Sequence, residues 1–208
     1  MKRIIFLIVI IALVSCKKEK TKSSTSSVTE GIPIARSVSK IIKQRDFSIK
    51  NFSRIELISY YDRISWDTIK YKGEQPINKI LVDDFKLTFD STMVQERVVL
   101  NKTQEKELIN LIVCDTCIPE EISSACYMPR HMIIFRDSKD RIIGYNEFCL
   151  NCAGSRISPN LDGFQKYCYS DMGELFKKFG IKLFVEDDQL GKEYSIIDSL
   201  KRSKKKLK

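Results

Sequence analysis

The sequence predicts an α+β fold in which an antiparallel sheet packs against a few helices and cysteines staple the domain. Three observations lead to this prediction. The apolar pattern becomes strand-like from about residue 48, two later segments have helical spacing, and six cysteines lie between residues 114 and 168. With 208 residues, of which 43% are hydrophobic, the chain can bury one core of ordinary size.

The clearest pair of strands is a hairpin. Residues 130–136 and 141–149 are apolar segments on either side of the turn Asp137-Ser-Lys-Asp140. We expect Ile133, Phe135 and Ile142 on one face of this pair and Met132, Ile134 and Ile143 on the other. Apolar residues on both faces predict that the hairpin lies in a sheet covered on both sides.

Other segments complete the predicted sheet and supply its helices. Short strands are expected within residues 52–61, 79–81, 85–89, 97–100 and 181–184. Residues 103–113 and 171–179 carry apolar side chains three and four positions apart, which predicts two amphipathic helices. We expect Asn101 or Thr103 to cap the first helix and Gly180 to end the second.

The formal net charge of +9 is concentrated at the two ends of the chain. Residues 31–200 contain 24 Lys and Arg against 25 Asp and Glu, so the globular part is close to neutral. The basic end, residues 201–208, contains no aromatic side chain that could stack on a base. We therefore expect no nucleic-acid partner and interpret this end as a solvated tail, or as a segment attracted to anionic lipid.

The first 16 residues differ in pattern from the rest of the chain. Met1-Lys-Arg3 is positive, and residues 4–14 form an apolar run that is shorter than the roughly 20 residues needed to span a bilayer. The following Leu13-Val-Ser-Cys16 resembles the lipobox of bacterial lipoproteins. This resemblance implies cleavage before Cys16, a diacylglycerol on its thiol and a further acyl chain on the new amino group, which together anchor the protein stably.

Four parts follow from this interpretation: a removed signal peptide (1–15), a lipidated cysteine with a flexible tether (16–35), one globular domain (36–187) and a basic tail (188–208). In the lipoprotein sorting rule, Asp after the cysteine retains a protein at the inner membrane. Lys17 stands at that position. The resemblance therefore implies the outer membrane, facing the periplasm or the cell surface, with the membrane as a partner through the lipid. As a further partner we expect another envelope protein or a surface ligand.

Six cysteines remain beyond Cys16, and an even number in an exported chain favours disulfides. They are Cys114, Cys117, Cys126, Cys149, Cys152 and Cys168. If residues 137 and 140 face each other, the hairpin register brings Cys126 close to Cys152 or Cys149. We therefore favour a bridge from Cys126 to one of these two, with Cys168 taking the other and Cys114 bridging Cys117.

Metal binding is the alternative that the cysteine spacing leaves open. Cys114-Asp-Thr-Cys117 and Cys149-Leu-Asn-Cys152 are two C-x-x-C pairs, and four thiolates suit tetrahedral zinc, or copper. Further candidate ligands are Cys126, Cys168 and His131. Thiol–disulfide exchange is a third hypothesis, but Cys114 follows a predicted helix, and the C-terminal end of a helix disfavours a thiolate.

The segment Cys126-Tyr-Met-Pro-Arg-His131, the hairpin and Cys149-x-x-Cys152 together resemble the core of a group of small exported bacterial proteins. The resemblance implies no activity. It marks Cys126, Arg130, His131, Cys149, Cys152 and Cys168 as the candidate heart of the domain. Because the chain has neither a G-x-S-x-G motif nor a Gly-rich phosphate loop, we favour a non-enzymatic binding or assembly role without a cofactor.

Overall fold

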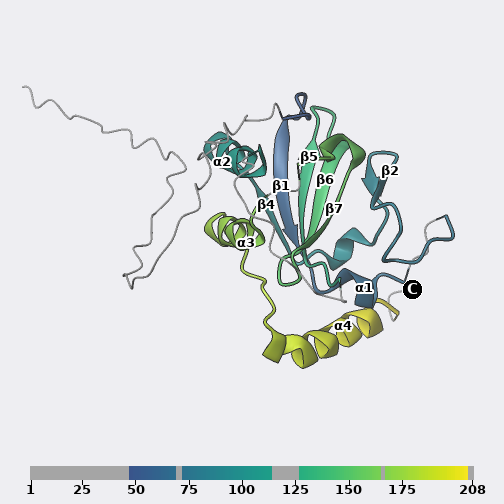
Figure 1. Ribbon diagram of the computed structural model, residues 1–208. Helices are drawn as coiled ribbons and strands as arrows, with labels where there is room; N and C mark the ends of the chain where they lie inside the picture. The colour runs from purple at the N-terminus through teal and green to yellow at the C-terminus, as the bar shows by residue number, and fades with distance from the viewer. Residues whose placement is uncertain (1–46, 69–71, 114–126, 165–166, 206–208) are drawn as a thin grey trace, which may run out of the picture. The chain divides into compact units, whose positions relative to one another are not determined.

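The computed structural model describes residues 47–68, 72–113, 127–164 and 167–205, all within the compact unit Lys40–Lys208 (Figure 1). Its main sheet is antiparallel and has the strand order β4-β1-β5-β6-β7. These strands are β1 (Arg54–Ser59), β4 (Glu96–Val99), β5 (His131–Arg136), β6 (Ile142–Cys149) and β7 (Gly154–Ile157). A small hairpin pairs β2 (Val82–Asp83) with β3 (Lys86–Leu87).

Within the described residues, four α-helices accompany the sheets, which confirms the predicted α+β class. They are α1 (Arg63–Trp66), α2 (Lys102–Val113), α3 (Tyr169–Lys178) and α4 (Leu190–Lys205). The same part of the chain has 3-10 turns at Ser91–Met93, Pro159–Leu161 and Asp187–Gln189. Among the described helices, none combines the length and the apolar character that a membrane crossing requires.

The main sheet is covered on both faces, as the hairpin pattern predicts. On one face, Leu57 and Ile133 belong to an apolar cluster that includes Leu108 of α2 and Phe176 of α3. On the other face, a second cluster has as members Ile58, Met132, Ile134, Trp66, Phe89 and Ile197 of α4. Figure 1 shows α2 and α3 on one side of the sheet and β2 on the other. The two faces therefore have separate apolar cores.

A β-bulge changes the expected faces of the central hairpin. The register of β5 and β6 shifts between Phe135 and Arg136. Ile142 therefore packs in the cluster of Met132 and Ile134, and Ile143 packs against the opposite cluster. The prediction for Ile142 and Ile143 was wrong because an extra residue in one strand moves its side chains to the other face.

Local sequence signals explain where α2 and α3 begin or end. The Asn101 side chain accepts hydrogen bonds from the backbone N–H groups of Thr103 and Gln104, both at 3.0 Å, and Gln104 accepts from Asn101 N at 2.9 Å. This reciprocal pattern is a capping box. Helix α3 ends before Gly180, whose φ of +105° suits the left-handed residue after a helix.

Residues 181–184 are not a strand, although the sequence suggests one. Their polar backbone groups bind side chains instead of a neighbouring strand. The N–H groups of Lys182 and Leu183 donate to the Glu96 carboxylate at 3.1 and 2.9 Å, and the Leu183 carbonyl lies 2.8 Å from His131 Nε2. Side-chain partners thus replace the ladder that a strand would need.

A buried ionic network ties α1 and the segment after it to the sheet. The Arg63 guanidinium donates to both Glu147 oxygens, at 2.6 and 3.0 Å, and both side chains are inaccessible to solvent. Arg63 also pairs with Asp67 at 3.1 Å, and Asp67 binds Lys79 at 2.6 Å. The hydroxyls of Tyr60 and Tyr127 donate to Glu147 at 2.8 and 3.1 Å. Two cations and two carboxylates therefore neutralise one another.

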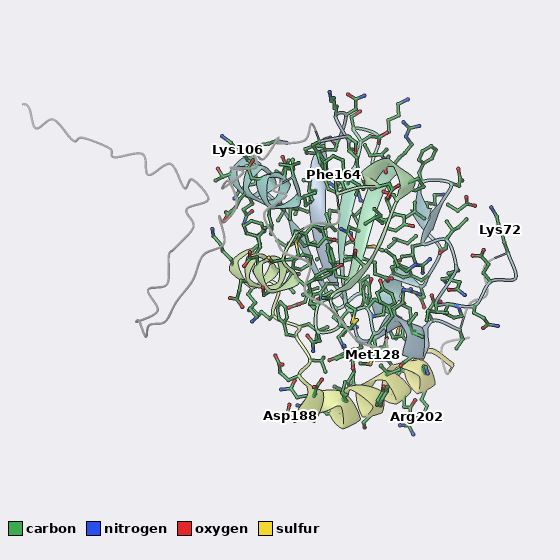
Figure 2. The ribbon with its side chains drawn as sticks, viewed as in Figure 1. Lys72, Lys106, Met128, Phe164, Asp188 and Arg202 are labelled. Carbon is green, nitrogen blue, oxygen red and sulfur yellow. A yellow bond between two sulfur atoms is a disulfide. The ribbon has the colours of Figure 1, made fainter. Side chains whose placement is uncertain are left out.

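Helix α4 docks through a second buried ion pair, although the sequence assigns its residues to a basic tail. Glu193 accepts two hydrogen bonds from Arg130, at 2.8 and 2.5 Å, and one from Asp62 N at 2.8 Å. Ile197 is only 1% exposed within the second apolar cluster. Figure 2 shows Met128 between the sheet and α4. Apolar residues that recur every third or fourth position give this otherwise basic helix a face that packs on the domain.

We expect Arg63→Met to destabilise the domain by about 3–5 kcal/mol, because it leaves Glu147 buried without its cation. Chemical denaturation followed by circular dichroism measures this loss. Lys177→Met is the matched control, since the Lys177–Glu174 pair is exposed at 52% and 73% and should leave the unfolding midpoint unchanged. Equal effects of the two substitutions would show that the network does not stabilise the fold.

Candidate functional site

The cysteines were the main chemical signal of the sequence, and the structure pairs two of them differently from the prediction. Cys149 forms a disulfide with Cys152, with their Cα atoms 5.4 Å apart. The predicted bridge from Cys126 to one of these two residues was therefore wrong. Strand β6 ends at Cys149, and the chain turns at once into β7, so its nearest cysteine is its own neighbour along the chain.

The remaining cysteine predictions divide between described and undescribed residues. Cys168 precedes α3 and is also disulfide-bonded. Cys16, Cys114, Cys117 and Cys126 lie outside the described residues. Because a sulfur in a disulfide is not a thiolate, Cys149, Cys152 and Cys168 cannot bind zinc in this state. Within the described ranges, no three His, Cys, Asp or Glu side chains gather in a geometry that could hold a metal ion.

His131 and Arg130, the other two residues of the predicted heart, both lie in the interior. His131 is 3% exposed and packs between the rings of Phe176 and Phe184, whose centroids are 5.4 and 4.8 Å from its own. Burial lowers the pKa of His131 to about 4, although its bond to the Leu183 carbonyl opposes the shift. His131 is thus a neutral core residue at neutral pH, with Nε2 donating to Leu183.

We expect alkylation of the denatured, unreduced protein to leave Cys149, Cys152 and Cys168 unmodified, because their sulfurs are already bonded. Peptide mapping by mass spectrometry measures this outcome, and the same sample after reduction is the control in which all three become reactive. Alkylated Cys149 and Cys152 in a sample that also contains stoichiometric zinc would contradict the disulfide and support the metal hypothesis.

The low pKa of His131 predicts an acid-sensitive stability. The unfolded chain binds a proton near pH 6.5, whereas the folded chain resists it until about pH 4. The free energy of unfolding should therefore fall by about 3 kcal/mol as the pH drops from 6.5 to 4. Denaturation curves across this range test the prediction. His131→Gln keeps a donor for the Leu183 carbonyl but does not titrate, and equal losses in both proteins would contradict it.

The structure reveals a different candidate site, a cavity of about 670 Å³ between the β2–β3 hairpin and the β5–β6 end of the main sheet. We call it the hairpin cavity. Its cationic lining residues are Lys86, Arg97, Arg136, Lys139 and Arg141, and its acidic ones are Asp84 and Asp140. The lining therefore carries more positive than negative charge, although the globular part of the chain is close to neutral.

A buried carboxylate organises the cations beside this cavity. Glu56, on β1, is 2% exposed and binds Arg54 at 2.8 Å, Arg136 at 3.1 Å and also Arg97. Burial opposes its ionisation, but the hydrogen bond and charge of Arg136 and the contact with Arg54 lower the pKa of Glu56 below its ordinary value. Three guanidinium groups thus surround Glu56, and Asp140 pairs with two of them, Arg54 and, at 3.6 Å, Arg136. Three cations therefore face two carboxylates at this wall of the cavity.

Phe85 forms one side of the hairpin cavity in an unusual backbone conformation. Asp84 and Phe85 link β2 to β3 with φ values of +45° and +60°, a two-residue turn that normally takes Asn-Gly. A bulky residue in this region costs on the order of 1–3 kcal/mol. Phe85 is 45% exposed, and the centroid of its ring lies 4.7 Å from the Arg141 guanidinium carbon. Its carbonyl accepts a hydrogen bond from Ile142 N at 3.1 Å.

Sequence reasoning missed this cavity because its side chains come from four separate segments. Two signals in the sequence point to it. One is a charged residue inside an apolar strand, Glu56 between Ile55 and Leu57, and the other is Phe85 at a position where a tight turn favours glycine. Neither signal shows which arginines converge. Comparison with protein families, curated proteins and solved structures found no match for this chain.

Proposed function

We propose that this chain is a lipid-anchored lipoprotein of the bacterial cell envelope whose folded domain binds a ligand without transforming it. The hairpin cavity is the observation that supports binding. Its guanidinium and ammonium groups offer permanent positive charge and hydrogen-bond donors, which suit recognition of an anion.

Two features of the cysteines support the proposed envelope location. Residues 1–16 resemble a lipoprotein signal, with Cys16 as the lipidated position. The Cys149–Cys152 disulfide supports an oxidising compartment, because thiols in the cytosol are kept reduced. The tether after Cys16 would let the domain reach ligands away from the membrane surface. The proposed location is the outer membrane, with the domain facing the periplasm.

We expect Cys16→Ala to abolish incorporation of tritiated palmitate and to move most of the protein out of the membrane fraction, because the acylated atom is lost. Ser15→Ala is the matched control, since it keeps a small residue before the cysteine and should label as the native chain does. A Cys16→Ala chain that still takes up the label, or a native chain that takes up none, would refute the lipoprotein proposal.

A further inference from the structure

We propose that the hairpin cavity binds the phosphate ester of a small molecule with a sugar or nucleoside body, with the phosphate against Arg97 and Arg136 and the body against Phe85. This inference rests on the proposed binding role and adds the chemical class of the ligand. It is independent of the lipid anchor, because every residue of the cavity lies in the folded domain.

The charge of the lining favours a phosphate over a single carboxylate. Five cationic and two acidic side chains line the cavity, a net of +3, and Glu56 behind Arg97 and Arg136 and Asp137 behind Arg141 offset part of this charge. A phosphate monoester carries between one and two negative charges at neutral pH and has three strong acceptor oxygens. A planar guanidinium can offer two parallel donors to such a group, so two arginines at one wall match its geometry.

The two arginines that we assign to the phosphate are held in place before any ligand arrives. Arg97 and Arg136 both bind Glu56, and Arg136 also donates to the Asp140 carbonyl at 2.7 Å. Arg136 is 14% exposed and is largely fixed in the wall, whereas Arg97 is 38% exposed and faces solvent. Pre-ordered donors lose little conformational entropy on binding, which makes this wall better suited to recognition than free surface lysines.

Phe85 supplies the apolar side of the proposed site. Its ring is half exposed at the cavity, and the Arg141 guanidinium lies over it. A sugar or base could pack on this ring while its phosphate meets the arginines. The left-handed conformation of Phe85 adds an independent argument, because a bulky residue in a glycine position indicates a role that outweighs the strain.

The volume of the cavity sets the size of the ligand. Small-molecule sites commonly measure roughly 300–1,000 Å³, and about 670 Å³ lies within that range. A nucleoside monophosphate or a sugar phosphate has a suitable size, whereas inorganic phosphate alone would leave the Phe85 wall without contact.

The test uses the full chain, solubilised in a non-ionic detergent, and calorimetric titration with AMP. We expect a Kd below about 1 mM for AMP, and much weaker binding of adenosine or inorganic phosphate. Arg97→Gln should weaken AMP binding about tenfold or more, because it removes charged donors while Arg54 and Arg136 still neutralise Glu56. Arg202→Gln is the matched control on α4, outside the cavity lining, and should not change the Kd (Figure 2).

A second variant separates binding from folding. Phe85→Gly fits the left-handed turn, so we expect an unchanged or higher unfolding midpoint together with weaker AMP binding. A midpoint that falls together with the affinity would show that Phe85 serves the fold rather than the ligand, and would overturn its assignment as the apolar wall.

Three results would overturn the proposal as a whole. AMP and ribose 5-phosphate could both fail to bind. Arg97→Gln and Arg202→Gln could weaken binding equally, which would indicate a diffuse charge effect. The protein could bind phosphatidylglycerol vesicles through Arg97 but bind neither soluble ester, which would show that the cavity contacts a lipid surface instead. Palmitate labelling at Cys16 would be unaffected by any of these outcomes, so failure of the ligand class and failure of the lipid anchor are distinguishable.

Discussion

The buried pair between Arg63 and Glu147 is the constraint on which the second face of the sheet depends. Arg63 belongs to α1, Glu147 to β6, and Lys79 joins the network through Asp67. Arg63 Nη1 also donates to the Pro76 carbonyl at 2.8 Å, and Arg156 of β7 donates to the Lys79 carbonyl at 2.7 Å. These bonds place the chain from α1 to β2 on the sheet, and with it the hairpin that bounds the cavity.

The two large charge clusters follow the same rule with different results. Charges removed from water are costly unless partners compensate them. In the network of Arg63 and Glu147, two cations meet two carboxylates, and all four side chains are inaccessible to solvent. Around Glu56, three arginines face two carboxylates, Glu56 and the exposed Asp140, and the remaining positive charge is stable because Arg54 and Arg97 reach solvent. The same requirement therefore yields a structural core at one place and an anion-attracting wall at the other.

The buried disulfide and the strained turn at Phe85 contribute differently to the protein. The Cys149–Cys152 disulfide closes the turn at the end of β6, where Cys149 is 1% and Cys152 is 9% exposed. A bridge buried in this way holds the edge of the sheet and offers no thiol to a partner or a metal. Phe85, by contrast, keeps an unfavourable backbone conformation at an exposed position. Stability is concentrated where the chain is covered, and the strained residue lies where a ligand can reach it.

The α+β class, the central hairpin, the coverage of both sheet faces, a helix cap at Asn101 or Thr103 and the stop at Gly180 could all be predicted from the sequence. These features depend on local periodicity and on short-range hydrogen bonds. The proposed lipoprotein signal likewise rests on contiguous residues. Tertiary contacts were needed to establish the partner of Cys149, the bulge that exchanges the faces of Ile142 and Ile143, the docking of α4 and the gathering of arginines around Glu56. These features join residues that are far apart in the chain or depend on one extra residue in a strand, and no local pattern encodes which distant partner a charge or a sulfur will meet.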